Sequence, residues 1–193
     1  FYIIKVETGS TVYTLTYGNF ALQSSIKIGS RTLASYGYSA DGNHYLTSLD
    51  YGNGDGVDYS YDRYGRLKKE TYEDSETVSY GYDNNGELAT VRDSETDREN
   101  GYYYDLIGRL TKYTEKGAGH DYSVSYSYNT LNQLSKLVEE VNGSKRTTTY
   151  SYDDDNRVIK KKTGSVSRSY TYDGYGRVSG KITAYDSSQI KSE

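Results

Sequence analysis

The stretch of sequence that decides the fold is Tyr59-Ser60-Tyr61-Asp62-Arg63-Tyr64-Gly65-Arg66-Leu67. The chain has 193 residues and repeats this pattern, Tyr-x-Tyr-Asp-x-x-Gly-Arg-Leu, at a spacing of 20–24 residues. The second Tyr of each copy falls at Tyr38, Tyr61, Tyr82, Tyr104, Tyr128, Tyr152 and Tyr172, and a more degenerate unit lies around Tyr17. A nearly fixed period indicates one supersecondary unit per repeat, with insertions confined to loops. We therefore expect residues 1–193 to form a single array of about eight repeats without separate domains, with the clear repeats at 36–180.

Each repeat is predicted to be a β-hairpin that turns at its Asp-x-x-Gly segment. This segment matches a three-residue hairpin loop, in which Asp hydrogen-bonds to the backbone of the turn and Gly takes a positive φ. Where Gly is replaced, Asn stands instead, and Asn is the non-glycine residue that best tolerates this backbone region. The predicted turn residues are Asp62, Gly65, Asp83, Gly86, Asp105, Gly108, Asn129, Asn132, Asp153, Asn156, Asp173 and Gly176.

The composition also favours strands over helices. The chain contains 26 Tyr and no Pro, Cys, Met or Trp, and its Tyr and Thr residues alternate with the period of two that is typical of strands. The segments between repeats carry turn signals of their own at Asn53-Gly54, Gly117-Ala118-Gly119, Asn142-Gly143 and Gly164-Ser165. We expect a type I′ turn at Asn53-Gly54. The predicted fold is all-β, a meander of antiparallel hairpins that forms one long curled β-sheet.

The predicted turn sets the register of each hairpin. If Asp62 pairs with Arg66, then Tyr61 pairs with Leu67, and the two Tyr residues of each repeat share one face of the sheet. The same register places Asp–Arg pairs across the turns at 62/66, 105/109, 153/157 and 173/177, each contributing about 0.2–1 kcal/mol. It also places a Lys opposite the first Tyr of four repeats, at Lys69, Lys112, Lys136 and Lys160.

The repeats resemble the YD-repeat family, also called RHS repeats. The resemblance rests on Tyr59–Leu67 and its copies and on the Gly-Asn-Gly turn at Gly52–Gly54. It implies a β-strip that spirals into a hollow shell, as in bacterial polymorphic toxins, insecticidal toxin complexes, wall-associated proteins and teneurins, where the shell encloses or displays another domain. The family's core segment with an Asp-Pro self-cleavage motif has no counterpart here, because the sequence contains no Pro. The resemblance therefore implies a secreted or cell-surface location, but neither autoproteolysis nor an attached toxin.

Few residues suggest catalysis or metal binding. The absence of Cys excludes disulfides and thiolate chemistry. His44 and His120 have no Ser or Asp partner at a catalytic spacing, so we expect both in solvent-exposed loops. The stretch Asp50–Asp58 lacks the ligand spacing of an EF-hand. The turns account for the repeated Asp residues, so we predict no enzyme, no metal and no cofactor.

Two functional hypotheses remain open. The first is a non-enzymatic structural segment of a YD-repeat shell or stalk, part of a larger secreted or cell-surface protein. The second is a carbohydrate- or cell-wall-binding module, because rows of exposed aromatic rings can stack on sugar rings. Its glycan-contact face would consist of Tyr59, Tyr61, Tyr80, Tyr82, Tyr102, Tyr104, Tyr126, Tyr128, Tyr150, Tyr152, Tyr170 and Tyr172.

The expected partners are further repeats of the same chain, or a second copy paired edge to edge. A strand at the edge of a sheet exposes unpaired N–H and C=O groups, and neither Phe1–Ile4 nor Tyr185–Gln189 has the character of a capping unit. Such an association should depend only weakly on salt. Glycan is the other expected partner. The formal net charge of −4 and the short apolar runs predict no nucleic-acid binding and no membrane insertion.

Overall fold

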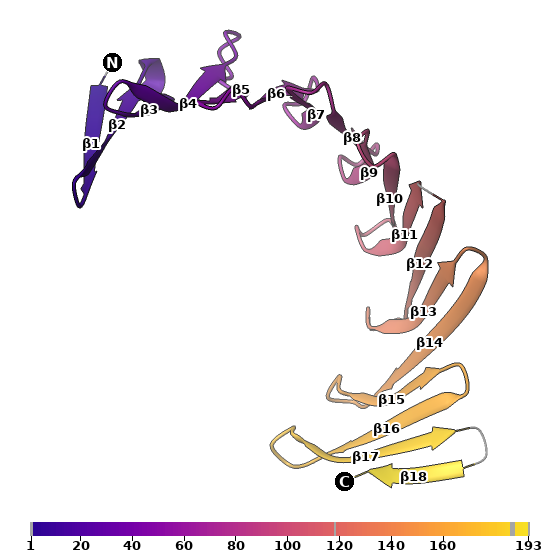
Figure 1. The fold of residues 1–193 in the computed structure, drawn as a ribbon. Coiled ribbons are helices and arrows are strands. Elements are labelled where there is room, and N and C mark those ends of the chain that lie inside the picture. Colours follow the sequence, from indigo (N-terminus) through magenta and orange to yellow (C-terminus); the bar gives the residue numbers. More distant parts are fainter. Residues whose placement is uncertain (1, 118, 186–187, 193) are drawn as a thin grey trace. The chain divides into compact units, whose positions relative to one another are not determined.

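The chain is all-β, as the repeat pattern predicts (Figure 1). The structure is a computed structural model that describes residues 2–117, 119–185 and 188–192. These residues form 18 strands and one short 3-10 turn at Asn19–Ala21. The strands up to β9 are β1 (Tyr2–Thr8), β2 (Thr11–Tyr17), β3 (Gln23–Ile28), β4 (Arg31–Tyr38), β5 (Leu46–Tyr51), β6 (Gly56–Tyr61), β7 (Leu67–Tyr72), β8 (Thr77–Tyr82) and β9 (Leu88–Asp93). The remaining strands are β10 (Arg98–Tyr104), β11 (Leu110–Gly117), β12 (His120–Tyr128), β13 (Leu134–Val141), β14 (Ser144–Tyr152), β15 (Val158–Thr163), β16 (Val166–Tyr172), β17 (Val178–Tyr185) and β18 (Ser188–Ser192).

The chain divides into two compact units. Unit 1 comprises Phe1–Asp83 and Thr90–Asp97, and unit 2 comprises Asn84–Ala89 and Arg98–Glu193. From β1 to β8 in unit 1, each strand pairs antiparallel with the next strand along the chain. The same holds from β10 to β18 in unit 2. The predicted meander of antiparallel hairpins is therefore confirmed, whereas the single array over residues 1–193 stays a prediction.

Beyond the turn, seven hairpins contain a β-bulge that the sequence did not reveal, in addition to the predicted G1 bulge of the turn itself. Tyr61 pairs with Leu67 as predicted, but Ser60 pairs with Lys69, and Tyr59 pairs with Glu70. Lys68 is therefore an extra residue, and the predicted pairing of Tyr59 with Lys69 is wrong. The same shift of register precedes Tyr17, Tyr38, Tyr104, Tyr128, Tyr152 and Tyr172. A bulge moves every later side chain of the strand by one position, which exchanges the two faces.

This exchange moves the four predicted lysines to the other face. Lys69, Lys112, Lys136 and Lys160 pair with Ser60, Tyr103, Ser127 and Ser151, the residues that lie between the two Tyr of their repeats. We call the side of the sheet that carries those two Tyr the Tyr face, and the other side the opposite face. The lysines therefore belong to the opposite face, and the predicted placement of a Lys opposite the first Tyr is wrong.

Within each unit the strands form a single layer without a two-sided core. Among the described residues, the buried hydrophobic side chains are Ala34 and Val124, which are 7% and 5% exposed. The Tyr residues of the repeat pattern are half-buried, so they lie against their neighbours on the sheet and not beneath a second layer. Stability must therefore come from the strand ladders and from side-chain contacts between adjacent repeats.

The turns between repeats differ in part from expectation. At Asn53-Gly54, the N–H of Tyr51 donates to the C=O of Asp55, and Gly54 alone has a positive φ, +101°. This is a three-residue loop, so the predicted type I′ turn is wrong there. At Asn142-Gly143 both residues have positive φ, as a type I′ turn requires. Ala118, in the predicted turn at 117–119, lies outside the described residues.

In the described part of the chain, no helix is long and apolar enough to cross a membrane.

Candidate functional site

The repeat turn is closed by backbone and side-chain hydrogen bonds. The Asp62 N–H donates to the Arg66 C=O at 2.9 Å, and the Gly65 N–H donates to the Asp62 C=O at 3.0 Å. The Asp62 Oδ1 accepts the backbone N–H groups of Tyr64 and Arg66 at 2.8 and 3.0 Å. Its Oδ2 accepts the Arg66 Nε at 2.7 Å and lies 2.6 Å from Nη2. One carboxylate therefore holds both the backbone of the loop and the side chain that follows it.

The other repeats place their predicted turn residues in the same loop. The two backbone hydrogen bonds recur for the pairs Asp105/Arg109, Asn129/Gln133, Asp153/Arg157 and Asp173/Arg177. Asp83 and Gly86 belong to the turn that follows β8. The residues at the glycine position have φ values of +85° at Gly42, +79° at Gly65, +91° at Gly86, +80° at Gly108, +63° at Asn132, +65° at Asn156 and +78° at Gly176. These are the values for which glycine, and next to it asparagine, is best suited.

The turn carboxylates have lowered pKa values. At Asp62 and Asp105, burial opposes the lowering of the pKa, and hydrogen bonds from the side chain and backbone of the following Arg outweigh it. At Asp173, the backbone N–H of Arg177 is the largest cause of the lowered pKa, followed by the Arg177 side chain. The pKa of Asp153 is lowered in the same way by Arg157, against burial. These groups are therefore ionised at neutral pH and act as hydrogen-bond acceptors.

In six repeats, the second Tyr links its repeat to the preceding one. Its hydroxyl donates to a backbone carbonyl at the start of the preceding return strand, where the bulge lies. The bonds are Tyr38 to Gln23 at 2.9 Å, Tyr61 to Leu46 at 2.8 Å, Tyr82 to Leu67 at 2.9 Å, Tyr128 to Leu110 at 2.8 Å, Tyr152 to Leu134 at 2.8 Å and Tyr172 to Val158 at 2.7 Å. In unit 1 the pairing of β7 with β8 reaches only Lys69, so the Tyr82 hydroxyl takes the place of a strand partner for Leu67.

The turn Arg completes this link by lying over the ring of the same Tyr. The guanidinium carbon of Arg109 is 4.5 Å from the centre of the Tyr128 ring. The same contact joins Arg66 to Tyr82 at 4.2 Å and Arg157 to Tyr172 at 4.8 Å. A guanidinium over an aromatic face is attracted by the ring quadrupole, and it also covers the ring. Asp, Arg, Tyr and a backbone carbonyl thus form one connected group that spans two repeats.

The two Asn residues at the glycine position make a further contact between repeats. The Nη1 of Arg109 donates to the Asn132 Oδ1 at 2.7 Å, and the Nε2 of Gln133 donates to the Asn156 Oδ1 at 2.7 Å. Each bond joins residues 23 positions apart, one fewer than the 24-residue spacing of these repeats, because the donor follows the glycine position and the acceptor occupies it. The sequence reasoning treated Asn only as a residue that tolerates positive φ. The co-occurrence of Asn with a donor one repeat earlier was the signal that could have revealed this contact.

The first Tyr residues of the repeats form fewer hydroxyl hydrogen bonds than the second. In the described part of the chain, the first-Tyr hydroxyl with a hydrogen bond is that of Tyr80, which donates to the Glu70 Oε2 at 3.1 Å. Burial, followed by the charge of Glu70, raises the pKa of Tyr80 to about 12. The rings of the first tyrosines are half-buried, like those of the second. The twelve Tyr residues that we predicted as one glycan-contact face therefore divide into two sets with different roles in the structure.

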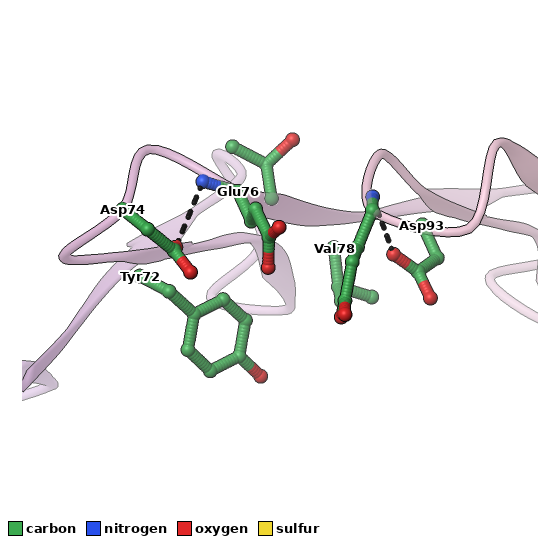
Figure 2. Close-up of a pocket in the computed structure, with 7 residues that line it drawn as sticks. Tyr72, Asp74, Glu76, Val78 and Asp93 are labelled. Carbon is green, nitrogen blue, oxygen red and sulfur yellow. Dashed lines mark hydrogen bonds between the residues drawn. The ribbon is translucent and has the colours of Figure 1, made fainter.

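An acidic pocket lies among the turns at the other end of the hairpins in unit 1 (Figure 2). It has a volume of about 260 Å³ and is lined by Tyr72, Asp74, Glu76, Thr77, Val78, Asp93 and Glu95. The Asp74 Oδ1 accepts the Glu76 N–H at 3.2 Å. Burial and the neighbouring carboxylates, Asp74 first, raise the pKa of Glu76. No group of three or more His, Asp or Glu in the described residues is placed to hold a metal ion. The sequence reasoning missed this pocket, whose signal was the acidic composition of residues 73–76 and 93–97.

The two histidines belong to different units, and both differ from expectation. The His44 ring is half-buried and packs on Phe20, with ring centres 4.2 Å apart, so the prediction of a solvent-exposed loop histidine is wrong for its ring. His120 is exposed but begins strand β12 and does not lie in a loop.

Comparison with known proteins agrees with this geometry. Residues 61–98 match the family model described as RHS Repeat. Residues 61–98 therefore carry the RHS repeat. No curated protein matches the chain. The family match begins at Tyr61, the second Tyr of the stretch that decides the fold, and it extends through two repeat turns.

Solved structures show the same fold over almost the whole chain. The crystal structure of TcdB2-TccC3-TEV is similar over 95% of this chain and 13% of its own, with a TM-score of 0.57 and 14% identity. The Photorhabdus luminescens Tc holotoxin pore with the mutation TccC3-D651A is similar over 92% of this chain and 12% of its own, with a TM-score of 0.57 and 16% identity. The crystal structure of TcdB2-TccC3 without its hypervariable C-terminal region is similar over 92% of this chain and 13% of its own, with a TM-score of 0.55 and 16% identity. The chain therefore spans about an eighth of each of these proteins, and the likeness shows the fold.

Proposed function

We propose that this chain is a non-enzymatic structural segment, a stretch of β-strip in the shell or stalk of a larger secreted or cell-surface protein. The observation that carries the proposal is the bond from the second Tyr hydroxyl to a carbonyl of the preceding repeat, which recurs in six repeats. The most regular chemical groups of the sequence, the Asp, Arg and Tyr of the motif, are used to join one repeat to the next. The similar solved structures, one of which is a Tc holotoxin pore, support a location outside the cell and a partnership with other parts of a large assembly.

A structural array should tolerate the exchange of one repeat for another. Residues 105–128 and 129–152 are both 24 residues long, and both run from the first turn residue to the second Tyr. We expect a chain in which a copy of 105–128 replaces 129–152 to fold cooperatively, with the far-UV circular dichroism of the parent. The matched control replaces 129–152 with a copy of 106–129, which has the same length but is shifted by one residue.

The one-residue shift should destroy the fold locally, because it turns each side chain of the segment to the other face. Loss of cooperative unfolding in the in-register exchange would contradict the structural proposal. So would equal tolerance of the two exchanges, because the repeat positions would then not matter.

A second candidate function, glycan binding, rests on the first tyrosines alone. The hydroxyls of Tyr102, Tyr126, Tyr150 and Tyr170 have no hydrogen bond within the described residues, and their rings are partly exposed. An amphipathic ring with a free hydroxyl suits stacking on a sugar and bonding to its hydroxyl groups. A screen against neutral glycans tests this. Binding that is lost in Tyr126→Ser and retained in Tyr128→Phe would support it, and no binding to any glycan would refute it.

A further inference from the structure

The turn between β13 and β14 contains a chemically reactive pair of residues. Asn142 and Gly143 form a two-residue loop in which both residues are exposed to solvent and both have positive φ, +46° and +84°. In an Asn-Gly pair, the backbone nitrogen of the glycine can attack the side-chain carbonyl carbon of the asparagine and close a five-membered succinimide ring. Glycine has no Cβ to obstruct this approach. The fold then decides whether the attacking nitrogen, the carbonyl and the amide leaving group are available.

All three groups are available at Asn142. Within the described residues, neither the Gly143 N–H nor the Asn142 Nδ2 has a hydrogen-bond partner. The Asn142 Oδ1 accepts the backbone N–H of Asp121 at 2.9 Å. A donor at this oxygen stabilises the negative charge that develops there as the nitrogen attacks.

The same contact holds the asparagine in place for the attack. The Asn142 N–H donates to the Asp121 C=O at 2.8 Å, so two hydrogen bonds fix Asn142 against β12 of the preceding hairpin. Rotation about the Cα–C bond of Asn142 then brings the Gly143 nitrogen toward a carbonyl that is already oriented, which lowers the entropic cost of ring closure.

The pair Asn53-Gly54 has the same two residues in a different setting. The Gly54 N–H donates to the Tyr51 C=O at 3.1 Å, so the attacking nitrogen is engaged. The Asn53 Nδ2 donates to the Asp55 carboxylate, so the leaving group is held as well. Ring closure at Asn53 must first break both hydrogen bonds.

The two other Asn-Gly pairs are also less accessible to the reaction. Asn100-Gly101 lies within β10, where Gly101 is buried and rotation of the backbone would break the pairing with β11. Gly86, which follows Asn85, occupies the glycine position of a repeat turn. In the turns that begin at Asp62 and Asp105, the N–H at this position donates to the carbonyl of the first turn residue. Among the four pairs, the structure therefore singles out Asn142.

We propose that Asn142 is a self-modification site at which the chain slowly converts asparagine to isoaspartate and aspartate. The Gly143 nitrogen forms a bond to the Asn142 Cγ, the Cγ–Nδ2 bond breaks, and Nδ2 leaves as ammonia with the proton of the Gly143 N–H. Water then opens the succinimide ring. Attack at the side-chain carbonyl gives aspartate, and attack at the main-chain carbonyl gives isoaspartate. No oxidant, reductant or cofactor takes part.

The isoaspartate product changes the joint between two hairpins. Its main chain runs through the former side chain and is one atom longer, in a loop of only two residues between Val141 and Ser144. The longer loop should disturb the pairing of these two residues and the contact with Asp121. The proposal goes beyond the structural role, because it gives one joint of the array a built-in and irreversible chemical change.

The test incubates the 193-residue chain in mildly alkaline buffer, with and without concentrated urea, and follows each Asn-Gly pair by peptide mass mapping. In buffer, Asn142 should convert about tenfold faster than Asn53, the factor that corresponds to the hydrogen bonds broken at Asn53. In urea the two sites should convert at similar rates, because the unfolded chain lacks the contacts that distinguish them. The control variant Asn142→Gln, whose longer side chain closes a five-membered ring no longer, should lose the fast reaction and leave the conversion of Asn53 unchanged.

Three results would overturn the proposal: conversion of Asn142 in buffer no faster than that of Asn53, a ratio of the two rates that is the same in urea, or a product without isoaspartate. The purified isoaspartate form should also melt at a lower temperature than the variant Asn142→Asp, which has the same charge and an unchanged main chain. Equal melting temperatures would contradict the disturbed turn. None of these results bears on the structural proposal, because repeat exchange tests that proposal independently.

Discussion

Removing one Tyr hydroxyl should measure how strongly adjacent repeats are linked. In Tyr152→Phe the ring stays in place, and the hydrogen bond of 2.8 Å to the Leu134 carbonyl is lost. An intramolecular hydrogen bond contributes a net 0.5–1.5 kcal/mol or so, and more when the group left behind is shielded from water. Leu134 is half-buried, so water reaches its carbonyl only in part. We expect a destabilisation of about 1 kcal/mol, which lowers the melting temperature of a chain of this size by about 2–4 °C.

Tyr150→Phe is the matched control, two residues away on the same strand and face. The Tyr150 hydroxyl has no hydrogen bond within the described residues, and the Lys161 ammonium lies 5.6 Å from the centre of its ring. This variant should unfold within about 0.3 kcal/mol of the parent, as surface substitutions usually do. Urea and thermal unfolding followed by far-UV circular dichroism compare the two. Equal destabilisation by the two substitutions would refute the claim that the second Tyr joins the repeats through its hydroxyl.

Three further predictions concern the turn. Gly176 has φ +78° and open space where a Cβ would lie, so Gly176→Val should cost about 1–3 kcal/mol of unfolding free energy and Gly176→Asn less than about 1 kcal/mol; equal thermal shifts would contradict the strained-backbone argument. Arg109→Lys should destabilise by about 1–2 kcal/mol, because it loses the two-nitrogen contact with Asp105 and the bond to Asn132, whereas Arg92→Lys, in an exposed pair of 3.5 Å, should be nearly neutral. Because the pKa of Asp105 is lowered in the folded chain, its carboxylate stabilises the fold at any pH above the ordinary value of 3.8, and this contribution is lost as the pH falls through the lowered pKa. The melting temperature of the parent should therefore fall more steeply with acidification below pH 4 than that of Asp105→Asn. Parallel curves of melting temperature against pH would show that this carboxylate contributes nothing.

The strands and the repeat turn could be predicted because each depends on residues close together in the sequence. Period-two alternation indicates strands, and an Asp followed three residues later by Gly or Asn specifies the loop. The pairing of Tyr61 with Leu67 follows directly from that loop. Local chemistry is sufficient at these positions, so the sequence alone leads to the observed hairpins.

The bulge beyond the turn could not be predicted, because it depends on the next repeat. In a straight ladder Lys69 faces Tyr59, and nothing within the hairpin argues against it. In the structure, the Leu67 carbonyl bonds to the Tyr82 hydroxyl, a partner 15 positions later. The bulge adjoins this hydrogen bond. Because the bond joins two successive hairpins, it cannot be predicted from the sequence of one hairpin. The error also affected the predicted surface, because the register decides which face carries the lysines.

The candidate site was predictable only as a set of residue types. The twelve Tyr were expected to act as one surface. In the structure, however, second tyrosines such as Tyr128 and Tyr152 donate their hydroxyls to backbone carbonyls, whereas the hydroxyls of first tyrosines such as Tyr126 have no hydrogen bond within the described residues. The Asn132 and Asn156 contacts and the acidic pocket depend on spacings of one whole repeat. Such spacings become informative only once the strand order is known.

The central claim is that contacts between adjacent repeats stabilise this chain and that a buried core does not. The most direct measurement is the free energy of unfolding as a function of the number of repeats, for chains that lack residues 129–152, contain them once, or contain them twice in tandem. For an array stabilised by nearest-neighbour contacts, the free energy should rise by a similar step with each added repeat, and all three chains should keep the same strand content. A free energy that is unchanged or lower when the repeat is doubled, with the fold retained, would contradict the account.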